Sequence, residues 1–193
     1  MGSSSLVKTT LFLAFVIAMI FSNINLAKAQ NQYHTTNGRV MLTVPVGDSV
    51  INLHSQKLLV ELDYKEANFK MKLPIISLHS GADSLDTIIS SLEDQEVTLV
   101  GKLYIENSSD SQDKIDTSKH PPMTFEFSAK MSYKQTDLPV TGTGSLEHIK
   151  GGSHLKCILG LTFEFKADFL QNKSLENENI KVHIHQLVLD QTL

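Results

Sequence analysis

Apolar and polar residues alternate along much of this chain, most plainly in the stretch HPPMTFEFSAKM at 120–131. Phe125 and Phe127 fall on one side of an extended backbone there, while Thr124 and Glu126 fall on the other. Successive side chains of a β-strand point to opposite faces, so this segment has one apolar face and one wet face. The apolar face must be covered by the rest of the protein alone, or by an apolar ligand as well.

The same alternation recurs almost from end to end and predicts at least eight strands. The turn-like sequence KEAN between the second and third of them indicates a hairpin. Only SGADSLDTIISSLEDQ looks helical: Ser84 could cap a short helix, a lid of at most about three turns, whose apolar stripe holds Leu85, Ile88, Ile89 and Leu92. The polar run 106–122 is expected to be an exposed connection. The predicted strands are 40–44, 57–64, 69–73, 97–106, 123–131, 140–149, 159–169 and 181–190.

Many antiparallel strands with so little helix give either a closed barrel or a two-sheet sandwich. The strands are long and several have no continuous apolar stretch, which favours a barrel that is wet outside and apolar inside. We therefore expect an all-β, antiparallel, lipocalin-like barrel of about eight strands with one short helix. Such a barrel has an interior just wide enough to be filled by its own side chains or to hold one slim ligand.

The first 29 residues have the order of a secretory signal peptide. Lys8 is followed by the apolar run Leu11–Phe21 and then by small residues that end at Ala29. The run is shorter than the roughly 20 apolar residues of a membrane-spanning helix, and an uncleaved anchor is the alternative. We expect cleavage near Ala29, a mature domain at 30–193 with no stable transmembrane segment, and a secreted or periplasmic location.

The mature chain is acidic, because Lys8 and Lys28 leave with the first segment and 21 Asp and Glu residues remain. This excess of negative charge argues against nucleic acid as a partner. Cys157 is the only cysteine, so no intrachain disulfide can form. Its apolar neighbours Ile158 and Leu159 indicate a buried, inert thiol.

Four stretches occur in an order that resembles a known family. They are an extended opening after a tyrosine (YHTTNGRVMLTV), a long hairpin leading to a serine-bearing turn (KLLVELDYKEANFKMKLPIISL), a proline before an aromatic strand (HPPMTFEFSAKM), and a glycine-punctuated strand pair (VTGTGSLEHIKGG, LKCILGLTFEF). This order resembles the YceI-like family, secreted bacterial lipocalin-like barrels that bind polyisoprenoid or other lipid chains. The chain differs from the family in SLDTIISSLEDQ, in the added strand VTLVGKLYIE and in the charged segment after Phe169. The resemblance implies the fold and leaves the ligand open.

The inward-facing aromatic and aliphatic residues are the candidates for function. They could line an elongated cavity that takes an acyl or prenyl chain, or they could simply fill a core. Each methylene of a buried chain contributes about 0.8 kcal/mol, so a long chain needs no specific polar contact. The candidate ligand-binding residues are Phe69, Met71, Phe125, Phe127, Leu161, Phe163 and Phe165.

Metal binding and catalysis are weaker interpretations. His183 and His185 are spaced to share one face of a strand, and His148 or His154 could add a third ligand, but solvated strand-face histidines are the simpler interpretation. There is no G-x-S-x-G elbow, and the glycine-rich TGTGS lacks the lysine of a phosphate loop. We therefore expect no cofactor and no enzymatic activity, and we keep His183 and His185 only as weak candidates for a metal site.

Two functional hypotheses lead, and a metal-binding protein that uses His183 and His185 is a third, less favoured one. In the first, a secreted barrel holds an isoprenoid, fatty acid or related long-chain amphiphile in its interior. In the second, a ligand-free barrel serves as a structural or protein-interaction module of the cell envelope. Asn107 and Asn172 would be glycosylation acceptors in a eukaryotic secretory route, whereas the family resemblance favours a bacterial envelope.

Overall fold

The computed structural model describes residues 32–64, 66–90, 95–104, 122–151, 154–167 and 178–191. In these ranges it has eight β-strands, one short 3₁₀ helix and one α-helix. Residues 1–29, which the sequence predicts to be a signal peptide, lie outside them, as do Asn107 and Asn172. In chain order the elements are β1 (Gln32–Val46), β2 (Ser49–Asp63), β3 (Asn68–Pro74), η1 (Ile75–Ser77), α2 (Asp83–Ser90), β4 (Glu96–Tyr104), β5 (Met123–Tyr133), β6 (Thr136–Gly151), β7 (His154–Lys166) and β8 (Asn179–Gln191).

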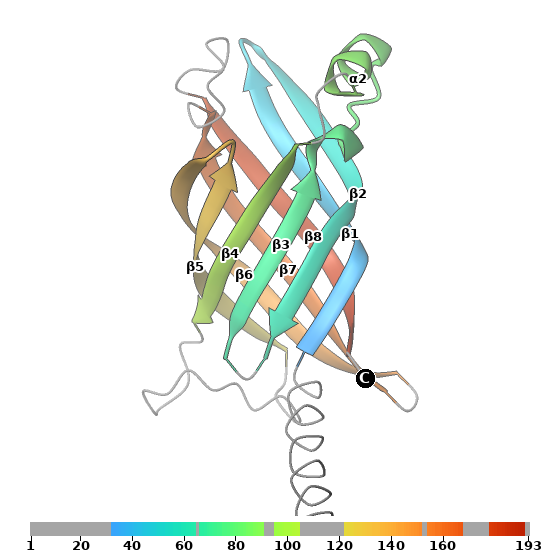
Figure 1. Ribbon diagram of the computed structural model, residues 1–193, viewed down its shortest axis with the longest axis vertical. Coiled ribbons are helices and arrows are strands. Elements are labelled where there is room, and N and C mark those ends of the chain that lie inside the picture. Colours follow the sequence, from blue (N-terminus) through green and yellow to red (C-terminus); the bar gives the residue numbers. More distant parts are fainter. Residues whose placement is uncertain are drawn as a thin grey trace, which may run out of the picture.

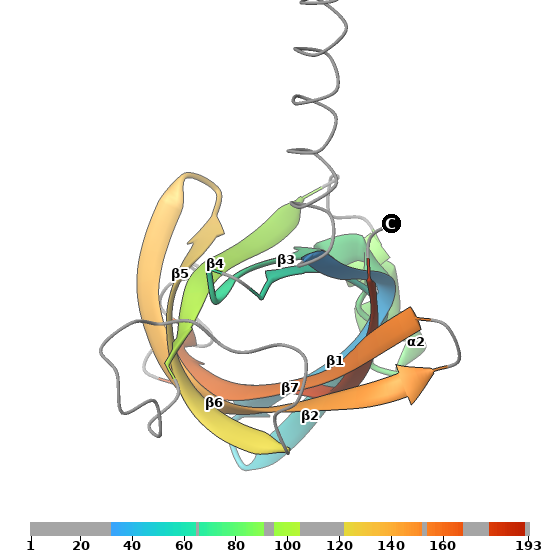
Figure 2. The same cartoon turned by 90° about the horizontal axis from the view of Figure 1, so that it is seen from below.

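The eight strands form a closed antiparallel barrel in which every strand pairs with its neighbours in sequence (Figure 1). Closure comes from β1, which pairs with β2 on one side and with β8 on the other. Viewed along its axis, the sheet is a continuous ring (Figure 2). The expected all-β barrel of about eight strands is therefore confirmed, and the two-sheet sandwich is excluded.

The predicted alternation corresponds to the two faces of the barrel wall. On β5, Phe125 and Phe127 are buried inside, whereas Thr124 and Glu126 are exposed outside. The hairpin expected at KEAN joins β2 to β3, and Ala67 adopts the left-handed conformation there, with φ of 55°. Most strands extend beyond the segments that alternation predicted, because strand pairing continues where the hydrophobic pattern weakens.

The helix begins at Asp83, so the expectation that Ser84 caps it is wrong. The carboxylate of Asp86 instead holds the preceding turn, accepting hydrogen bonds from the Ser80 amide at 2.6 Å and the Ser80 hydroxyl at 2.8 Å. Ile89 is buried in the core, and α2 lies at one end of the barrel (Figure 1). The side chain of Ile88 and all of Leu92 lie outside the described part of the chain, as does the connection predicted at 106–122 apart from Pro122.

A β-bulge interrupts the pairing of β7 with β8. Leu159 pairs with Leu187 and Leu161 pairs with Ile184, so the single residue Gly160 lies opposite two residues of β8. These two residues, His185 and Gln186, are both exposed. A bulge of this kind re-aims side chains and bends the strand locally.

Three inward-facing glycines make room for phenylalanine rings on neighbouring strands. A Cβ atom on Gly101 would lie 2.8 Å from Phe69 Cζ, and one on Gly142 would lie 2.8 Å from Phe127 Cε1. A Cβ atom on Gly144 would lie 2.6 Å from Phe125 Cε2. Real Cβ atoms do not approach this closely, so each ring occupies the space of a missing side chain.

Among the residues that the structure describes, no helix is both long enough and apolar enough to cross a membrane.

We predict that Gly142→Ala lowers the free energy of unfolding by about 1–3 kcal/mol, because the added methyl overpacks the interior. Its Cβ would collide with the Thr162 carbonyl oxygen, a backbone atom that cannot rotate away, and with Phe163 Cβ at 2.7 Å. Urea unfolding followed by circular dichroism measures the change.

Gly160→Ala is the matched control, because its Cβ would face the outside and meet only the Ser145 hydroxyl at 3.1 Å and the Ile184 carbonyl at 3.6 Å. We expect its stability to change by less than about 1 kcal/mol. Equal losses in the two variants would contradict the overpacking argument.

Candidate ligand-binding interior

A row of aromatic rings runs around the inside of the wall. Phe127 on β5 contacts Phe69 on β3 and Phe163 on β7, with ring centroids 5.6 Å and 5.8 Å apart. Both contacts are edge-to-face, with interplanar angles of 86° and 90°, an arrangement that aromatic pairs prefer. The three strands are separated by β4 and β6, whose glycines lie beneath the rings.

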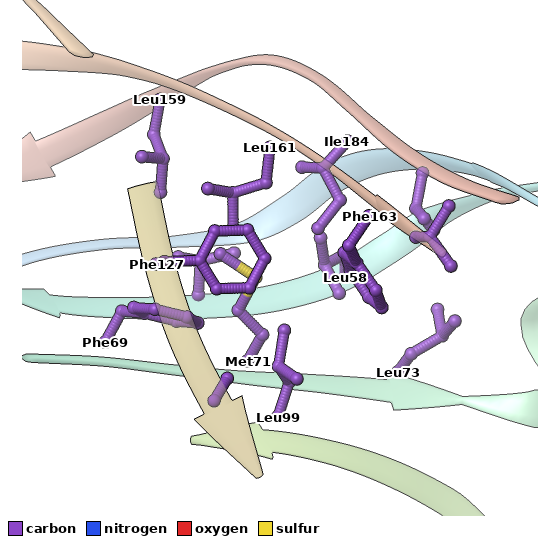
Figure 3. Close-up of a cluster of buried hydrophobic side chains, with 14 of the residues drawn as sticks. Leu58, Phe69, Met71, Leu73, Leu99, Phe127, Leu159, Leu161, Phe163 and Ile184 are labelled. Atoms are coloured by element: carbon purple, nitrogen blue, oxygen red, sulfur yellow. The ribbon is translucent and has the colours of Figure 1, made fainter. Parts of the chain in front are cut away.

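All seven residues predicted to line the interior are buried, at 8% exposure or less. They belong to one core cluster with Leu58, Leu99 and Ile184. Figure 3 shows part of this cluster, in which Phe69, Phe127 and Phe163 converge from different strands. Within the described part of the chain, the middle of the barrel is therefore packed with its own side chains. Their role in binding a ligand stays a prediction.

A second cluster lies nearer the end of the barrel at which β1 begins and β8 ends. The Tyr64 ring stacks on His148, with centroids 4.8 Å apart, and Tyr33 lies 5.2 Å from Tyr64. Cys157 is fully buried beside them and pairs across the strands with His148. The buried thiol was predicted from the sequence and is confirmed.

Burial keeps the two phenols and the thiol of this cluster uncharged. It raises the pKa of the Tyr33 and Tyr64 phenols, and Cys157 adds to both shifts. Burial also raises the pKa of the Cys157 thiol to about 12, although the hydrogen bond from Tyr64 acts in the opposite direction. Since the thiolate is the reactive form of cysteine, this environment is unsuited to a nucleophile.

The histidines are divided between the two faces of the wall. His183 lies on the outer face, where its Nδ1 is 2.9 Å from the Thr162 hydroxyl oxygen, and the His183 and His185 ring centroids are 4.4 Å apart. Burial is the main cause that lowers the pKa of His183, and the nearby His185 and Lys181 lower it further.

His148 was considered as a third metal ligand for this pair, but it stacks with Tyr64 inside the barrel, so that grouping is wrong. The two-residue period that puts Leu146 inside could have placed His148 there too. The side chain of His154 is not described. Among the described side chains, no three His, Cys, Asp or Glu residues are grouped closely enough to hold a metal ion.

We predict that Cys157 resists modification in the folded protein. With a pKa of about 12, only about one thiol in ten thousand is ionised at pH 8, and the sulfur is also shielded from the reagent. Labelling by a chromogenic disulfide should be at least about a hundredfold slower than in denaturant, where one thiol per chain reacts. Fast stoichiometric labelling of the native protein would show that this end of the barrel is open.

Comparison with known proteins finds similarity in structure only. No family model matches the sequence, and no curated protein matches it. A polyisoprenoid-binding domain from Saccharophagus degradans, implicated in plant cell wall breakdown, superposes with a TM-score of 0.57 at 8% identity, over 85% of this chain and 99% of that one. BcnA from Burkholderia cenocepacia superposes with a TM-score of 0.55 at 9% identity, over 79% of this chain and 95% of that one.

At such low identity the likeness concerns the fold alone. It extends over nearly the whole of both solved chains, so the barrel corresponds to a complete domain of that architecture. The resemblance to the YceI-like family that the sequence motifs indicate is therefore confirmed at the level of the fold.

Proposed function

We propose that this protein binds one long-chain amphiphile, such as a polyisoprenoid or fatty acid, inside its barrel. The observation that carries the proposal is the composition of the inner wall, which is apolar on all eight strands. Among the described residues, Ser55 is the only polar residue that is buried as a whole, and its hydroxyl lies 2.7 Å from that of Ser77. The partly buried His148 also faces inward, near one end of the barrel, where it stacks on Tyr64. A wall of this kind selects a ligand by its length and apolar surface.

The packed interior can admit a ligand only if side chains move. Met71 and Met131 are unbranched and polarizable, so they can change rotamer at low cost and follow the outline of a new neighbour. The rings of Phe69 and Phe127 lie over glycines, where no Cβ atom blocks their approach to the wall. We infer that a chain enters by displacing these four side chains from the middle of the barrel.

The structural comparison supports the same class of ligand. The Saccharophagus degradans protein is a polyisoprenoid-binding domain, and it shares this barrel over most of both chains. The sequences have diverged to 8% identity, so the wall residues are this chain's own. The proposal therefore concerns a long apolar chain and leaves its exact chemistry to experiment.

A ligand-free structural or interaction module is the second candidate, and the packing of the interior favours it. The rings of Phe69, Phe127 and Phe163 already make edge-to-face contacts with one another. In such a module the same residues would contribute only to stability. The two candidates differ in whether the interior opens to an added chain.

We also propose that the protein acts outside the cytoplasm after losing residues 1–29. The support is the order of basic, apolar and small residues that ends at Ala29. The intact mass of the protein recovered from the extracellular or periplasmic fraction tests this. A chain that begins at Gln30 agrees with the proposal, and one that retains Leu11–Phe21 contradicts it.

We predict that affinity for straight-chain fatty acids rises by up to about fourfold with each added methylene until the interior is filled, because each buried methylene contributes about 0.8 kcal/mol. Displacement of a fluorescent fatty acid from the mature protein measures the series. Native mass spectrometry of protein from its own compartment, followed by organic extraction, identifies any resident chain. Failure to bind any member of the series, together with a bare sequence mass, would favour the ligand-free module.

Phe127→Leu separates binding inside the barrel from binding outside it. This change alters the wall at the centre of the aromatic row, and we expect it to shift affinity by at least about threefold while the barrel stays folded. Val100→Ala is the control, because Val100 is exposed on the outer face of β4. Binding that neither variant changes would place the ligand outside the barrel.

A further inference from the structure

The outer wall carries a groove of about 680 Å³ that the proposed lipid site does not use. Strand register explains which side chains meet there. One row across β5 to β8 consists of Glu126, Thr143, Thr162 and His183, which are successive register partners. The next row consists of Thr124, Ser145 and Gly160, followed by the bulged pair His185 and Gln186.

The hollow arises where a side chain is missing and a strand is bent. Gly160 faces outward from β7, and a Cβ atom there would meet only two neighbours within 4 Å. Opposite it, the bulge turns both His185 and Gln186 to the outside. Glycine and bulge together produce a depression in a wall that side chains cover elsewhere.

The chemistry of the groove suits a cation better than an anion or an apolar chain. Its outward side chains are four hydroxyls, one carboxylate, one amide and two imidazoles, and no lysine or arginine lines it. Phosphate or carboxylate ligands would find no positive charge to bind. Imidazole nitrogen with oxygen donors is the ligand set that zinc, copper and nickel accept.

The two imidazoles are placed to act together. Their ring centroids are 4.4 Å apart, and the Thr162 hydroxyl lies 2.9 Å from His183 Nδ1. When Nδ1 carries the proton and donates to that hydroxyl, Nε2 of His183 has a free lone pair. A hydrogen bond of this type orients metal-binding histidines in many proteins.

We propose that His183 and His185 bind one divalent transition-metal ion, Cu²⁺, Ni²⁺ or Zn²⁺, at this groove. Each histidine supplies one ring nitrogen, and water fills the remaining positions, because no third His, Cys, Asp or Glu among the described side chains is grouped with them. Thr162 is a positioning residue that holds the His183 ring. The site is open and exchangeable, and it is independent of the lipid proposal because it uses the opposite face of the wall.

Calorimetric titration of the mature protein with CuSO₄, NiCl₂ and ZnCl₂, in a buffer that does not bind metals, tests the site. We expect one ion per chain and tightest binding for Cu²⁺, since two nitrogens with open positions impose little geometry of their own. His183→Gln and His185→Gln should each weaken Cu²⁺ binding at least about tenfold. Electron paramagnetic resonance of the Cu²⁺ complex should show two coordinated imidazole nitrogens in the natural protein and one in each variant.

Thr162 variants and a distant histidine distinguish this site from general histidine affinity. Thr162→Val should weaken binding about 10–100-fold, whereas Thr162→Ser, which keeps the hydroxyl, should restore it to within a few-fold. His34→Gln removes an exposed histidine of β1, seven residues along the strand from Met41, the register partner of His183, and should change nothing. Cu²⁺ binding that both His183→Gln and His185→Gln leave unchanged, or spectra without two imidazole nitrogens, would overturn the proposal.

Discussion

Closure of the sheet by β1 and β8 is the constraint on which the rest of this structure depends. A ring of eight strands has a fixed interior, so the volume of the inward side chains is limited. The chain places large rings on β3, β5 and β7 and glycines on β4 and β6 between them. A larger residue at any of these glycines would need a smaller one beside it. Ring and glycine therefore form a single packing unit spread over neighbouring strands.

The sequence predicts which face a residue occupies much better than which residue lies beside it. Two-residue alternation correctly placed Phe125, Phe127 and Phe163 inside the barrel, because the period of a strand fixes the face. It could not pair Gly142 with Phe127 or Gly101 with Phe69, since these contacts depend on the register of different strands. The family resemblance anticipated the closed barrel and carried no information on these pairs.

The histidines show the same limit: the sequence predicts the face that a residue occupies better than it predicts the local geometry. His183 and His185 were correctly expected outside, because Val182 and Ile184, which alternate with them, continue the apolar face. The bulge next to them was not predicted, since a single added residue looks like ordinary variation in a half-polar strand. His148 was grouped with the candidate metal ligands because it is a histidine. Its position two residues after the inward-facing Leu146 predicts instead that it lies inside the barrel. At such positions the alternation of apolar and polar residues predicts the face of the strand better than the residue type does.

The packed interior determines the energetics of any lipid site. A chain entering an empty tube would gain the full transfer energy of its methylenes, but here it must first separate side chains that already contact one another. The net gain in free energy for each ligand methylene is then below the transfer value, and the first methylenes to enter the barrel contribute least. Short ligands would fail to open the barrel, while long ones would open it and then bind. This selects for length with no polar contact, and it makes the contacts of Phe127 with Phe69 and Phe163 the interactions that set the threshold.

Period-two geometry also explains how one wall can carry two unrelated sites. Leu161 and Phe163 face the interior from β7, while Thr162 between them faces the groove. A substitution on one face leaves the other largely intact, because the backbone keeps its place in the ring. Gly160 is the exception, since the bulge opposite it shifts the register between Leu159 and Leu161. Any change that straightened this bulge would move inner and outer side chains together, and would therefore couple the proposed metal site to the proposed lipid site.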